Sequence, residues 1–338
     1  MKATATMRQW QMREIDGRLA PRLADDVPRP QPGPGQLLLR VRAAGLNRGE
    51  FIAGHGLHGR GGAGSGNARP LGTEAAGEVV ALGAGVEGWR IGGRAMGRCA
   101  GAFADFALLD TREALAVPAT LDWAHAGAVP LVFMVVYDML VLQGRLRPGE
   151  TLLVAGVASG VGVAALQAAK AIGARVIGTS CSTAKLERLR ALGLDVGLNT
   201  RGPDFAAAVL DATAGRGADL AIDTVGGSVF AECLRALAFQ GRLAMVGYVD
   251  GVLRAELDLE ALHAKRLTLF GVSNKLRTPE QRAEPVPGFR ADWLPLMASG
   301  RIVPLVDRVF AFGQLAEAKA SMESTEHVGK LVLEGSRD

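Results

Sequence analysis

A glycine-rich turn is the part of this sequence whose residue types point most directly to chemistry. Glycine lets the backbone turn sharply and approach a pyrophosphate lying on the N-terminus of the following helix. The turn departs from the common G-x-G-x-x-G spacing, so its context has to support it. We predict that this turn binds a dinucleotide through Gly156, Ala158, Ser159, Gly160, Val161 and Gly162.

The segments on either side of the turn follow the order of a βαβ unit. An apolar run predicts a buried parallel strand over 152–154, and an alanine-rich run predicts a helix over 163–172 that ends at Gly173. A second strand is predicted over 174–179. This order is what makes the glycine turn specific for a nucleotide.

The end of the second predicted strand indicates which nucleotide binds. An NAD site usually places Asp or Glu there, whereas a 2′-phosphate is repelled by a carboxylate and needs donors or a cation. Here the chain offers Thr179, Ser180 and Lys185 and no carboxylate. This predicts NADPH as the cofactor. The alternative is that Lys185 is a solvated residue opening a helix over 185–192.

Further apolar segments, over 219–223, 242–246 and 267–272, continue the alternation of strands and helices. They predict a doubly wound sheet of about six parallel strands, with the cofactor at its carboxyl edge. Residues expected to line the cofactor at this edge are Val225, Gly247, Phe270 and Val272.

Composition sets the broad class. A chain of 338 residues with 49% hydrophobic content predicts about two domains, and a net charge of +4 without a basic block argues against nucleic acid. The three cysteines are widely spaced, as in reduced cytosolic proteins. Pro130 and Asp138 break the most apolar run, 126–142, so we expect no membrane span and a cytoplasmic protein.

The N-terminal part is rich in predicted strands. Short strands over 37–41, 78–82 and 106–109, separated by Gly and Pro turns, predict a partly open barrel. Between them, 54–70 is so rich in glycine that we expect a mobile loop. Its histidines, His55 and His58, lack further ligands at metal-site spacing, so we interpret them as exposed loop residues.

Several short blocks, in order along the chain, resemble the medium-chain dehydrogenases/reductases, and among them the zinc-independent quinone oxidoreductase subgroup. The blocks are Ala43-Ala44-Gly45-Leu46-Asn47, Gly72-Thr73-Glu74-Ala75-Ala76-Gly77-Glu78-Val79, Leu146-Arg147-Pro148-Gly149-Glu150, Gly160-Val161-Gly162, Asp223-Thr224-Val225-Gly226-Gly227, Gly241-Arg242-Leu243 and Gly329-Lys330-Leu331-Val332-Leu333. The resemblance implies a GroES-like β-rich catalytic domain (1–126 and 273–338) and a Rossmann domain (127–272). It also implies a homodimer that pairs the last Rossmann strand.

The resemblance also bears on metal. Zinc-containing members carry Cys and His at the places where this chain has Asn47 and Thr73, and neither Asn nor Thr suits tetrahedral zinc. We therefore predict no metal. Without a Lewis acid, hydride transfer to an acceptor that is already electrophilic, such as a quinone or an α,β-unsaturated carbonyl, is favoured over alcohol oxidation.

Candidate residues outside the Rossmann turn come from the same resemblance. It implies that Asn47 binds the nicotinamide ribose or the acceptor oxygen, although an asparagine there can equally form a turn. Tyr137 is a candidate proton donor, or a tyrosine that packs its ring at a domain boundary. Val135, in place of a family threonine, and Lys330 are predicted to contact the cofactor.

Three functions remain open at this level. The first is an NADPH-dependent quinone or enone reductase. The second is an enoyl-thioester (enoyl-CoA) reductase, for which Arg48, Arg60 and Arg69 would supply a basic entrance. The third is a protein that binds NADPH without turnover.

Overall fold

A β-rich part and an α/β part make up the structure, which is a computed structural model. It describes residues 5–15, 18–51 and 68–336. Residues 1–134 and 274–338 belong to one unit, called unit 1 below, and residues 135–273 form unit 2. The predicted loop over 54–70 lies largely outside the described residues, as do His55, His58 and Arg60.

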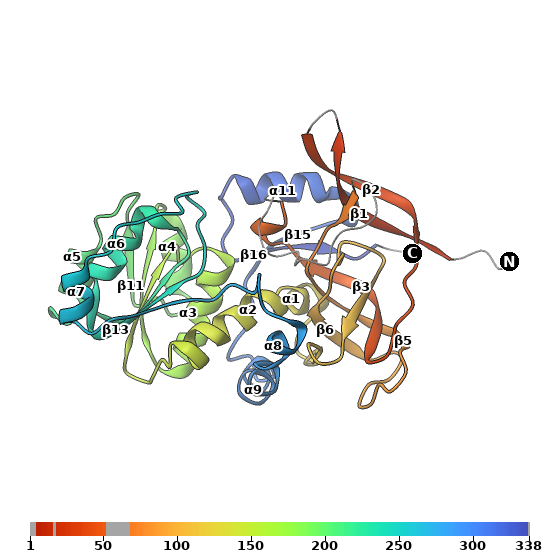
Figure 1. Cartoon of the computed structure of the whole chain (residues 1–338), viewed down its shortest axis with the longest axis horizontal. Coiled ribbons are helices and arrows are strands. Elements are labelled where there is room, and N and C mark those ends of the chain that lie inside the picture. The colour runs from red at the N-terminus through yellow and green to blue at the C-terminus, as the bar shows by residue number, and fades with distance from the viewer. Residues whose placement is uncertain (1–4, 16–17, 52–67, 337–338) are drawn as a thin grey trace. The chain divides into compact units, whose positions relative to one another are not determined.

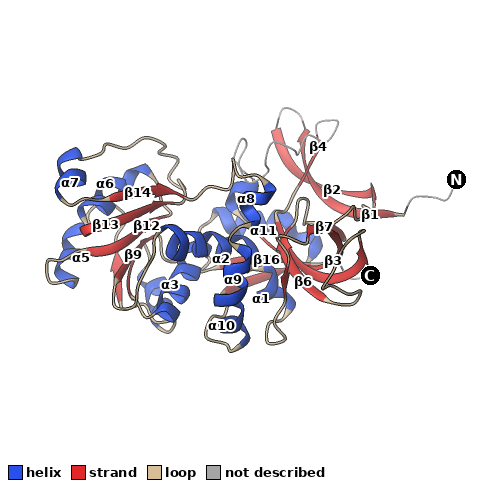
Figure 2. Ribbon diagram, turned by 60° about the horizontal axis from the view of Figure 1, so that its bottom comes forward, coloured by secondary structure: helices blue, strands red, loops and turns tan. Residues whose placement is uncertain are grey.

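Unit 2 is built on a parallel sheet in the order β11-β10-β9-β12-β13-β14 (Figures 1 and 2). The strands are β9 (Thr151–Ala155), β10 (Arg175–Ser180), β11 (Val196–Asn199), β12 (Ala218–Asp223), β13 (Leu237–Met245) and β14 (Thr268–Gly271). All strands run parallel, and successive strands are added outward from β9 to β11 on one side and from β12 to β14 on the other, which is the doubly wound arrangement. The predicted fold class and the six parallel strands are confirmed. β11 was not predicted, because its four residues are too short a signal.

Helices connect these strands. They are α3 (Gly160–Ile172), α4 (Thr183–Arg190), α5 (Ala206–Ala212), α6 (Gly227–Arg235) and α7 (Leu259–Ala264). Alternate strand residues, among them Leu153, Ile177 and Leu243, pack with residues of α5 and α6 in one buried cluster. Because successive side chains of a strand point to opposite faces, the intervening residues cover the other face of the sheet.

Unit 1 holds two sheets, with orders β2-β1-β4 and β15-β16-β3-β5-β6-β8, and β7 also pairs with β3. The strands are β1 (Thr6–Ile15), β2 (Arg18–Pro28), β3 (Gln36–Gly45), β4 (Ala68–Pro70), β5 (Glu74–Leu82), β6 (Arg94–Arg98), β7 (Phe106–Asp110), β8 (Leu115–Ala116), β15 (Val306–Phe310) and β16 (Lys330–Glu334). The strands predicted over 37–41, 78–82 and 106–109 fall in β3, β5 and β7. Strand β16, from the end of the chain, runs antiparallel to β3, which places C-terminal residues beside N-terminal ones.

The remaining helices, which do not connect strands of the parallel sheet, are short. They are α1 (Trp123–Gly127), α2 (Pro130–Tyr137), α8 (Pro279–Ala283), α9 (Val286–Asp292), α10 (Leu294–Ala298) and α11 (Leu315–Glu323). Pro130 begins α2, and a π-helical segment, Asp138–Gln143, follows Tyr137, so the apolar run over 126–142 is divided. None of the helices among the described residues is long and apolar enough to cross a membrane.

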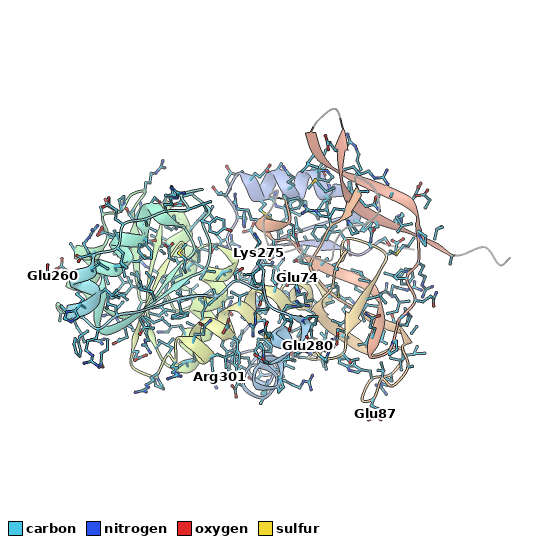
Figure 3. The ribbon with its side chains drawn as sticks, viewed as in Figure 1. Glu74, Glu87, Glu260, Lys275, Glu280 and Arg301 are labelled. Carbon is cyan, nitrogen blue, oxygen red and sulfur yellow. The ribbon has the colours of Figure 1, made fainter. Side chains whose placement is uncertain are left out.

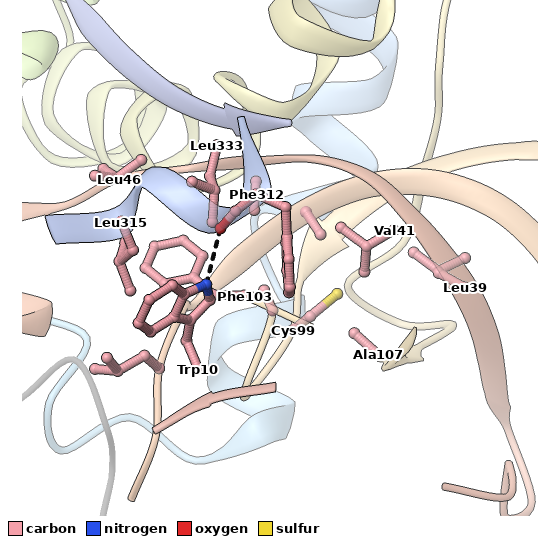
Figure 4. Packing of buried hydrophobic residues seen from close by; sticks show 14 of the residues in the cluster. Trp10, Leu39, Val41, Leu46, Cys99, Phe103, Ala107, Phe312, Leu315 and Leu333 are labelled. Atoms are coloured by element: carbon pink, nitrogen blue, oxygen red, sulfur yellow. Dashed lines mark hydrogen bonds between the residues drawn. The ribbon is translucent and has the colours of Figure 1, made fainter. Parts of the chain in front are cut away.

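The core of unit 1 joins distant parts of the chain (Figure 4). Trp10 of β1 packs in a cluster with Phe103, Phe312 and Leu333. The Trp10 indole N–H donates to the Phe312 carbonyl over 2.9 Å. Burying a polar N–H in an apolar cluster is tolerated because this carbonyl accepts its hydrogen bond.

Replacing Trp10 by Phe should destabilise the protein by about 2 kcal/mol, because the buried Phe312 carbonyl loses its donor and the core loses volume. The measurement is urea unfolding followed by far-UV circular dichroism. Trp89→Phe is the matched control, since Trp89 is only partly buried against the same cluster, and it should lose less than half as much. An equal loss in the two variants would remove the role given to this hydrogen bond.

Candidate functional site

The glycine turn of unit 2 connects β9 to α3. Gly156 has φ +80°, and a Cβ on it would lie 2.4 Å from the Thr224 hydroxyl oxygen, so both backbone conformation and space require glycine there. Ser159 accepts a hydrogen bond from the Gly162 N–H over 3.0 Å and donates to the Gly156 carbonyl over 2.9 Å. Ser159 is therefore the N-cap of α3, and the helix begins at Gly160 rather than at the predicted residue 163.

Three backbone N–H groups at this turn have no acceptor among the described residues. They belong to Ala158, Gly160 and Val161, whereas the N–H of Gly162 is bound by Ser159. The first N–H groups of a helix have no intrahelical partner, and an anionic phosphate is a suitable acceptor for them. The turn therefore fits the pyrophosphate of a dinucleotide. The Ser159 hydroxyl proton, in contrast, is used inside the turn.

The residues after β10 divide into two kinds. Thr179 is buried, and its hydroxyl oxygen accepts the Gly156 N–H over 3.1 Å, so it supports the turn. Ser180 accepts the Ser182 N–H over 3.3 Å, and Ser182 in turn caps α4, whose first turn carries Lys185. Lys185 and the hydroxyls around it are the groups that could hold a 2′-phosphate, and all of them lie in unit 2.

The ends of β12, β13 and β14 bring the other predicted cofactor residues to the same carboxyl edge. Val225 follows β12, Gly247 follows β13, Phe270 is in β14 and Val272 follows it. Gly247 approaches the backbone of Thr224 closely, since a Cβ on it would lie 3.3 Å from the Thr224 carbonyl oxygen. Four residues separated in sequence thus meet at one edge of one sheet.

Asp223, the last residue of β12, was missed by the sequence interpretation. Its Oδ1 accepts the N–H groups of Val225 and Gly226, over 2.8 and 2.9 Å, while its buried Oδ2 has no hydrogen-bond partner in the described part of the chain. Burial raises the pKa of this carboxyl to about 6. Its position at the end of a predicted apolar strand was the available signal, because a carboxylate there must bind backbone or ligand.

A second polar group lies in unit 1, where five side chains form one hydrogen-bonded cluster. They come from the end of β3 and the turn after it, from the start of β5 and from the start of β16: Asn47, Glu50, Thr73, Glu74 and Lys330. We call these residues the Asn47 cluster. Glu74 lies inside the unit, in contrast to Glu87, which projects from its surface (Figure 3).

Lys330 is the cation of the Asn47 cluster. Its ammonium donates to the Leu46 carbonyl, to Asn47 Oδ1 and to Glu74 Oε1, each over 2.8 Å. The side chains of Lys330 and Glu74 are 5% and 0% exposed. An ion pair removed from water to this degree is tolerated only when its hydrogen bonds are satisfied, as they are here.

Glu50 is the second carboxyl of the Asn47 cluster. It accepts hydrogen bonds from the Thr73 hydroxyl over 2.6 Å and from the Asn47 backbone N–H over 2.9 Å. Burial raises the pKa of Glu50 to about 7, and the neighbouring Glu74 charge also raises it; these two hydrogen bonds and the Lys330 charge oppose the rise. Near neutral pH this carboxyl therefore holds a proton part of the time.

Two family models match the chain. The one described as alcohol dehydrogenase GroES-like domain matches residues 33–119, and the one described as zinc-binding dehydrogenase matches residues 160–284. Solved structures with TM-scores of 0.81 to 0.84 cover nearly the whole chain. The chain belongs to the medium-chain dehydrogenase/reductase superfamily. It combines a GroES-like β-rich unit with a Rossmann-like unit, as the sequence predicted.

Individual relatives match over different lengths. The chain is 39% identical over 167 residues to the pikromycin polyketide synthase component PikAII of Streptomyces venezuelae, covering 49% of this chain and 4% of that protein. It is 33% identical over 181 residues to the mouse synaptic vesicle membrane protein VAT-1 homolog, covering 52% of this chain and 43% of that protein. The structure of mycobacterial Rv1454c complexed with NADPH has a TM-score of 0.84 at 28% identity, covering 97% of this chain and 99% of that one. This chain spans less than half the length of the two curated relatives, PikAII and the VAT-1 homolog.

One matching model is named for zinc, so the fit of a metal ion can be tested on the donor set. Where the resemblance places zinc ligands, Asn47 and Thr73 are poor ligands, and the Lys330 ammonium already compensates the Glu74 charge. A divalent cation among these groups would be repelled by that ammonium. These residues do not fit a metal ion. Within the described ranges, no group of three His, Cys, Asp or Glu side chains could hold one.

Tyr137 and Val135 lie at the C-terminal end of α2. The Tyr137 side chain is 3% exposed and Val135 is partly buried. A phenol buried to this degree can pass its proton only to a group that reaches it inside the protein. The assignment of Tyr137 as a proton donor therefore stays a prediction.

Glu50 and Glu74 are functional candidates that the sequence interpretation did not name. Both had a signal. Glu50 stands three residues after Asn47, the spacing of a capping box, and Glu74 precedes a run of small residues, Ala75-Ala76-Gly77, just before the strand predicted over 78–82. An acidic residue beside such a run indicates a buried partner, but nothing local indicated that the partner is Lys330.

Glu50→Gln should change how stability depends on pH. A carboxyl with a raised pKa in the folded chain stabilises the fold below its unfolded pKa, and that contribution is lost as pH rises through the folded value, here about 7. The wild type should thus lose on the order of 3 kcal/mol between about pH 4 and pH 7 through Glu50, since one pKa unit is about 1.4 kcal/mol. Urea unfolding across this range is the measurement.

The exposed Glu87 supplies the control, and Glu87→Gln should retain the wild-type slope. Asp223 contributes a slope of the same sign over a lower range, so the difference between the variants and the wild type is the quantity to compare. If Glu50→Gln keeps the full wild-type slope, Glu50 is ionised in the folded protein and its assignment is wrong.

Proposed function

We propose that this protein is a zinc-independent, NADPH-dependent reductase that transfers hydride to a quinone or an α,β-unsaturated carbonyl. The observation that supports it is the Lys330 ammonium, which lies 2.8 Å from both Asn47 Oδ1 and Glu74 Oε1. This donor set suits an ammonium rather than a Lewis-acidic metal. Hydride transfer to an acceptor that is already electrophilic needs no Lewis acid, whereas oxidation of a simple alcohol would need one.

NADPH as the cofactor is supported by unit 2 and by the Rv1454c structure in complex with NADPH. The N–H groups of Ala158, Gly160 and Val161 would bind its pyrophosphate, and Lys185 with Ser180 would bind the 2′-phosphate. No carboxylate follows β10 to repel that phosphate. Val225, Gly247 and the end of β14 would line the nicotinamide half at the carboxyl edge.

When bound, NADPH supplies a hydride from C4 of its nicotinamide ring. An enone would accept the hydride at its β-carbon and a proton at its α-carbon, and a quinone would accept the equivalent of both to become a hydroquinone. The chain would hold the π-systems of the nicotinamide and the acceptor close together and exclude water. Tyr137→Phe tests whether the proton comes from that phenol or from solvent.

A second candidate is an enoyl thioester as the acceptor. The polyketide synthases that match about half of this chain favour it. Two arginines proposed for a basic entrance use an N–H group within unit 1: Arg48 donates to the Met322 carbonyl and Arg69 to the Glu50 carbonyl. A thioester is also an activated carbonyl, so both candidates follow the same hydride chemistry.

We also propose that the protein is a cytoplasmic homodimer. Strand β14 is the last strand of the parallel sheet and pairs with β13 on one side. An edge strand with one open side can pair with the same strand of a second copy around a twofold axis.

The proposed activity predicts NADPH oxidation by chelator-treated protein when 1,4-benzoquinone, a simple enone or crotonyl-CoA is offered. Turnover should survive chelation, because the donor set suits no metal, and should be faster with NADPH than with NADH. Preference for crotonyl-CoA would move the thioester candidate ahead. NADPH binding without turnover of any acceptor would contradict catalysis and favour a binding protein.

Lys185→Ala should raise the KM for NADPH about tenfold and leave the KM for NADH unchanged, because a hydrogen bond to a charged group is worth about 1.5–3 kcal/mol. Steady-state kinetics with both cofactors measure this. Lys170→Ala is the control, since Lys170 forms an ion pair with Asp195 on the same unit. Equal changes for NADPH and NADH would show that Lys185 does not recognise the 2′-phosphate.

A further inference from the structure

The ammonium of Lys330 has no proton left for a ligand. An ammonium has three N–H groups, and those of Lys330 point to the Leu46 carbonyl, Asn47 Oδ1 and Glu74 Oε1. All three acceptors belong to unit 1. To bind a cofactor phosphate directly, Lys330 would have to give up one of these bonds in a place where little water reaches it.

The same contacts fix the orientation of the Asn47 side-chain amide. Lysine can only donate, so the atom facing Lys330 must be the amide oxygen, and an ionised Glu74 can only accept, so the atom facing it must be the amide nitrogen. The Asn47 Nδ2 to Glu74 Oε1 distance is 2.8 Å. A flipped amide would place NH₂ against an ammonium and oxygen against a carboxylate.

What remains of the hydrogen-bonding capacity of Asn47 is on its oxygen. Besides Glu74, the Nδ2 group lies 3.4 Å from the Gly45 carbonyl and from Glu50 Oε1, and 3.5 Å from the Thr73 hydroxyl, so both its N–H groups face acceptors of unit 1. The oxygen has two lone pairs, and Lys330 uses one. Asn47 is partly buried, and among the described residues Lys330 is the donor to this oxygen, so the second lone pair is available to a ligand.

We propose that Lys330 and Glu74 are positioning residues that orient Asn47 as a hydrogen-bond acceptor for a hydroxyl group, such as one on the nicotinamide ribose. This proposal rests on the proposed function. It separates the two roles that the sequence left open for Asn47, because an amide held in this way cannot donate to the oxygen of a carbonyl acceptor. It also changes the role of Lys330 from a cofactor contact to a support for Asn47.

One consequence concerns the acceptor. If Asn47 does not polarise the carbonyl oxygen, the acceptor must be electrophilic without that assistance. Quinones and conjugated enones meet this requirement, and unactivated ketones do not. The Asn47 cluster thus restricts the class of substrate, because it keeps the Asn47 N–H groups from the acceptor oxygen.

The positioning role can be tested without any ligand. The chain has four asparagines, Asn47, Asn67, Asn199 and Asn274, so labelling with ¹⁵N-asparagine gives four side-chain NH₂ signals. In the wild type the Asn47 NH₂ pair should be resolved and slow to exchange with solvent. Lys330→Met should shift the pair and speed its exchange at least tenfold, whereas Lys330→Arg, which keeps donors, should restore much of the protection. Unchanged Asn47 signals in Lys330→Met would overturn the positioning role.

The ligand role is tested by a double-mutant cycle on NADPH affinity, measured by fluorescence titration. Asn47→Ala and Lys330→Met should each weaken NADPH binding about tenfold, and the double variant should be no weaker than either single one. Binding of 2′,5′-ADP, which lacks the nicotinamide half, should be unchanged in all of them. Effects that multiply in the double variant would show that Lys330 contacts the cofactor by itself.

Further variants keep the test decisive. Glu74→Gln retains an acceptor for the Asn47 amide without the charge, and replaces Lys330→Met in both experiments if the methionine variant does not fold. Lys170→Met, on unit 2, is the matched control and should change neither the Asn47 signals nor NADPH affinity. A wild type that does not bind NADPH would refute the proposed function, while the NMR comparison would still decide the positioning role.

Discussion

The buried ion pair between Lys330 and Glu74 is the constraint on which the polar interior of unit 1 depends. Two charges removed from water this completely are destabilising by several kcal/mol each unless they are paired and hydrogen-bonded. The pair meets this requirement through Asn47 and the Leu46 carbonyl, which complete the coordination of the ammonium. Removing one partner would leave the other charge buried without compensation, so these residues act as one group.

The sheet of unit 1 has to bring this group together. Lys330 begins β16, Glu74 begins β5, and Asn47 follows β3, which lies between them in the sheet. Gly45 makes the approach possible, because a Cβ on it would lie 2.5 Å from Glu74 Oε1 and 2.7 Å from the Gly127 carbonyl. A side chain at that position would push the carboxylate away from its partners. The Ala-Gly-Leu-Asn segment is therefore a packing requirement as well as a family signature.

The site in unit 2 follows a different physical logic. Its groups are mainly backbone N–H, held in place by short local contacts such as the Ser159 cap and the bond from the Gly156 N–H to Thr179. Such a site needs glycine and small hydroxyl residues rather than charges, and it suits an anion. In unit 1 a cation is built into the protein, whereas in unit 2 the positive potential is supplied by unpaired amides.

The sequence by itself determined the βαβ unit, the six-stranded parallel sheet and the missing carboxylate after β10. Each of these depends on local signals: the period of apolar residues, the position of glycines and the residue type at a strand end. Local signals placed the start of α3 three residues too late. Gly160 and Gly162 disfavour a helix, but the hydrogen bond that Ser159 accepts from the Gly162 N–H starts the helix at Gly160. Only the tertiary structure decided that Lys330 meets Asn47 and Glu74, which are 283 and 256 residues away from it in sequence. This contact depends on the order of strands in a sheet, for which a single sequence carries no local signal. The buried network of Lys330, Glu74 and Glu50 therefore could not be predicted from the sequence.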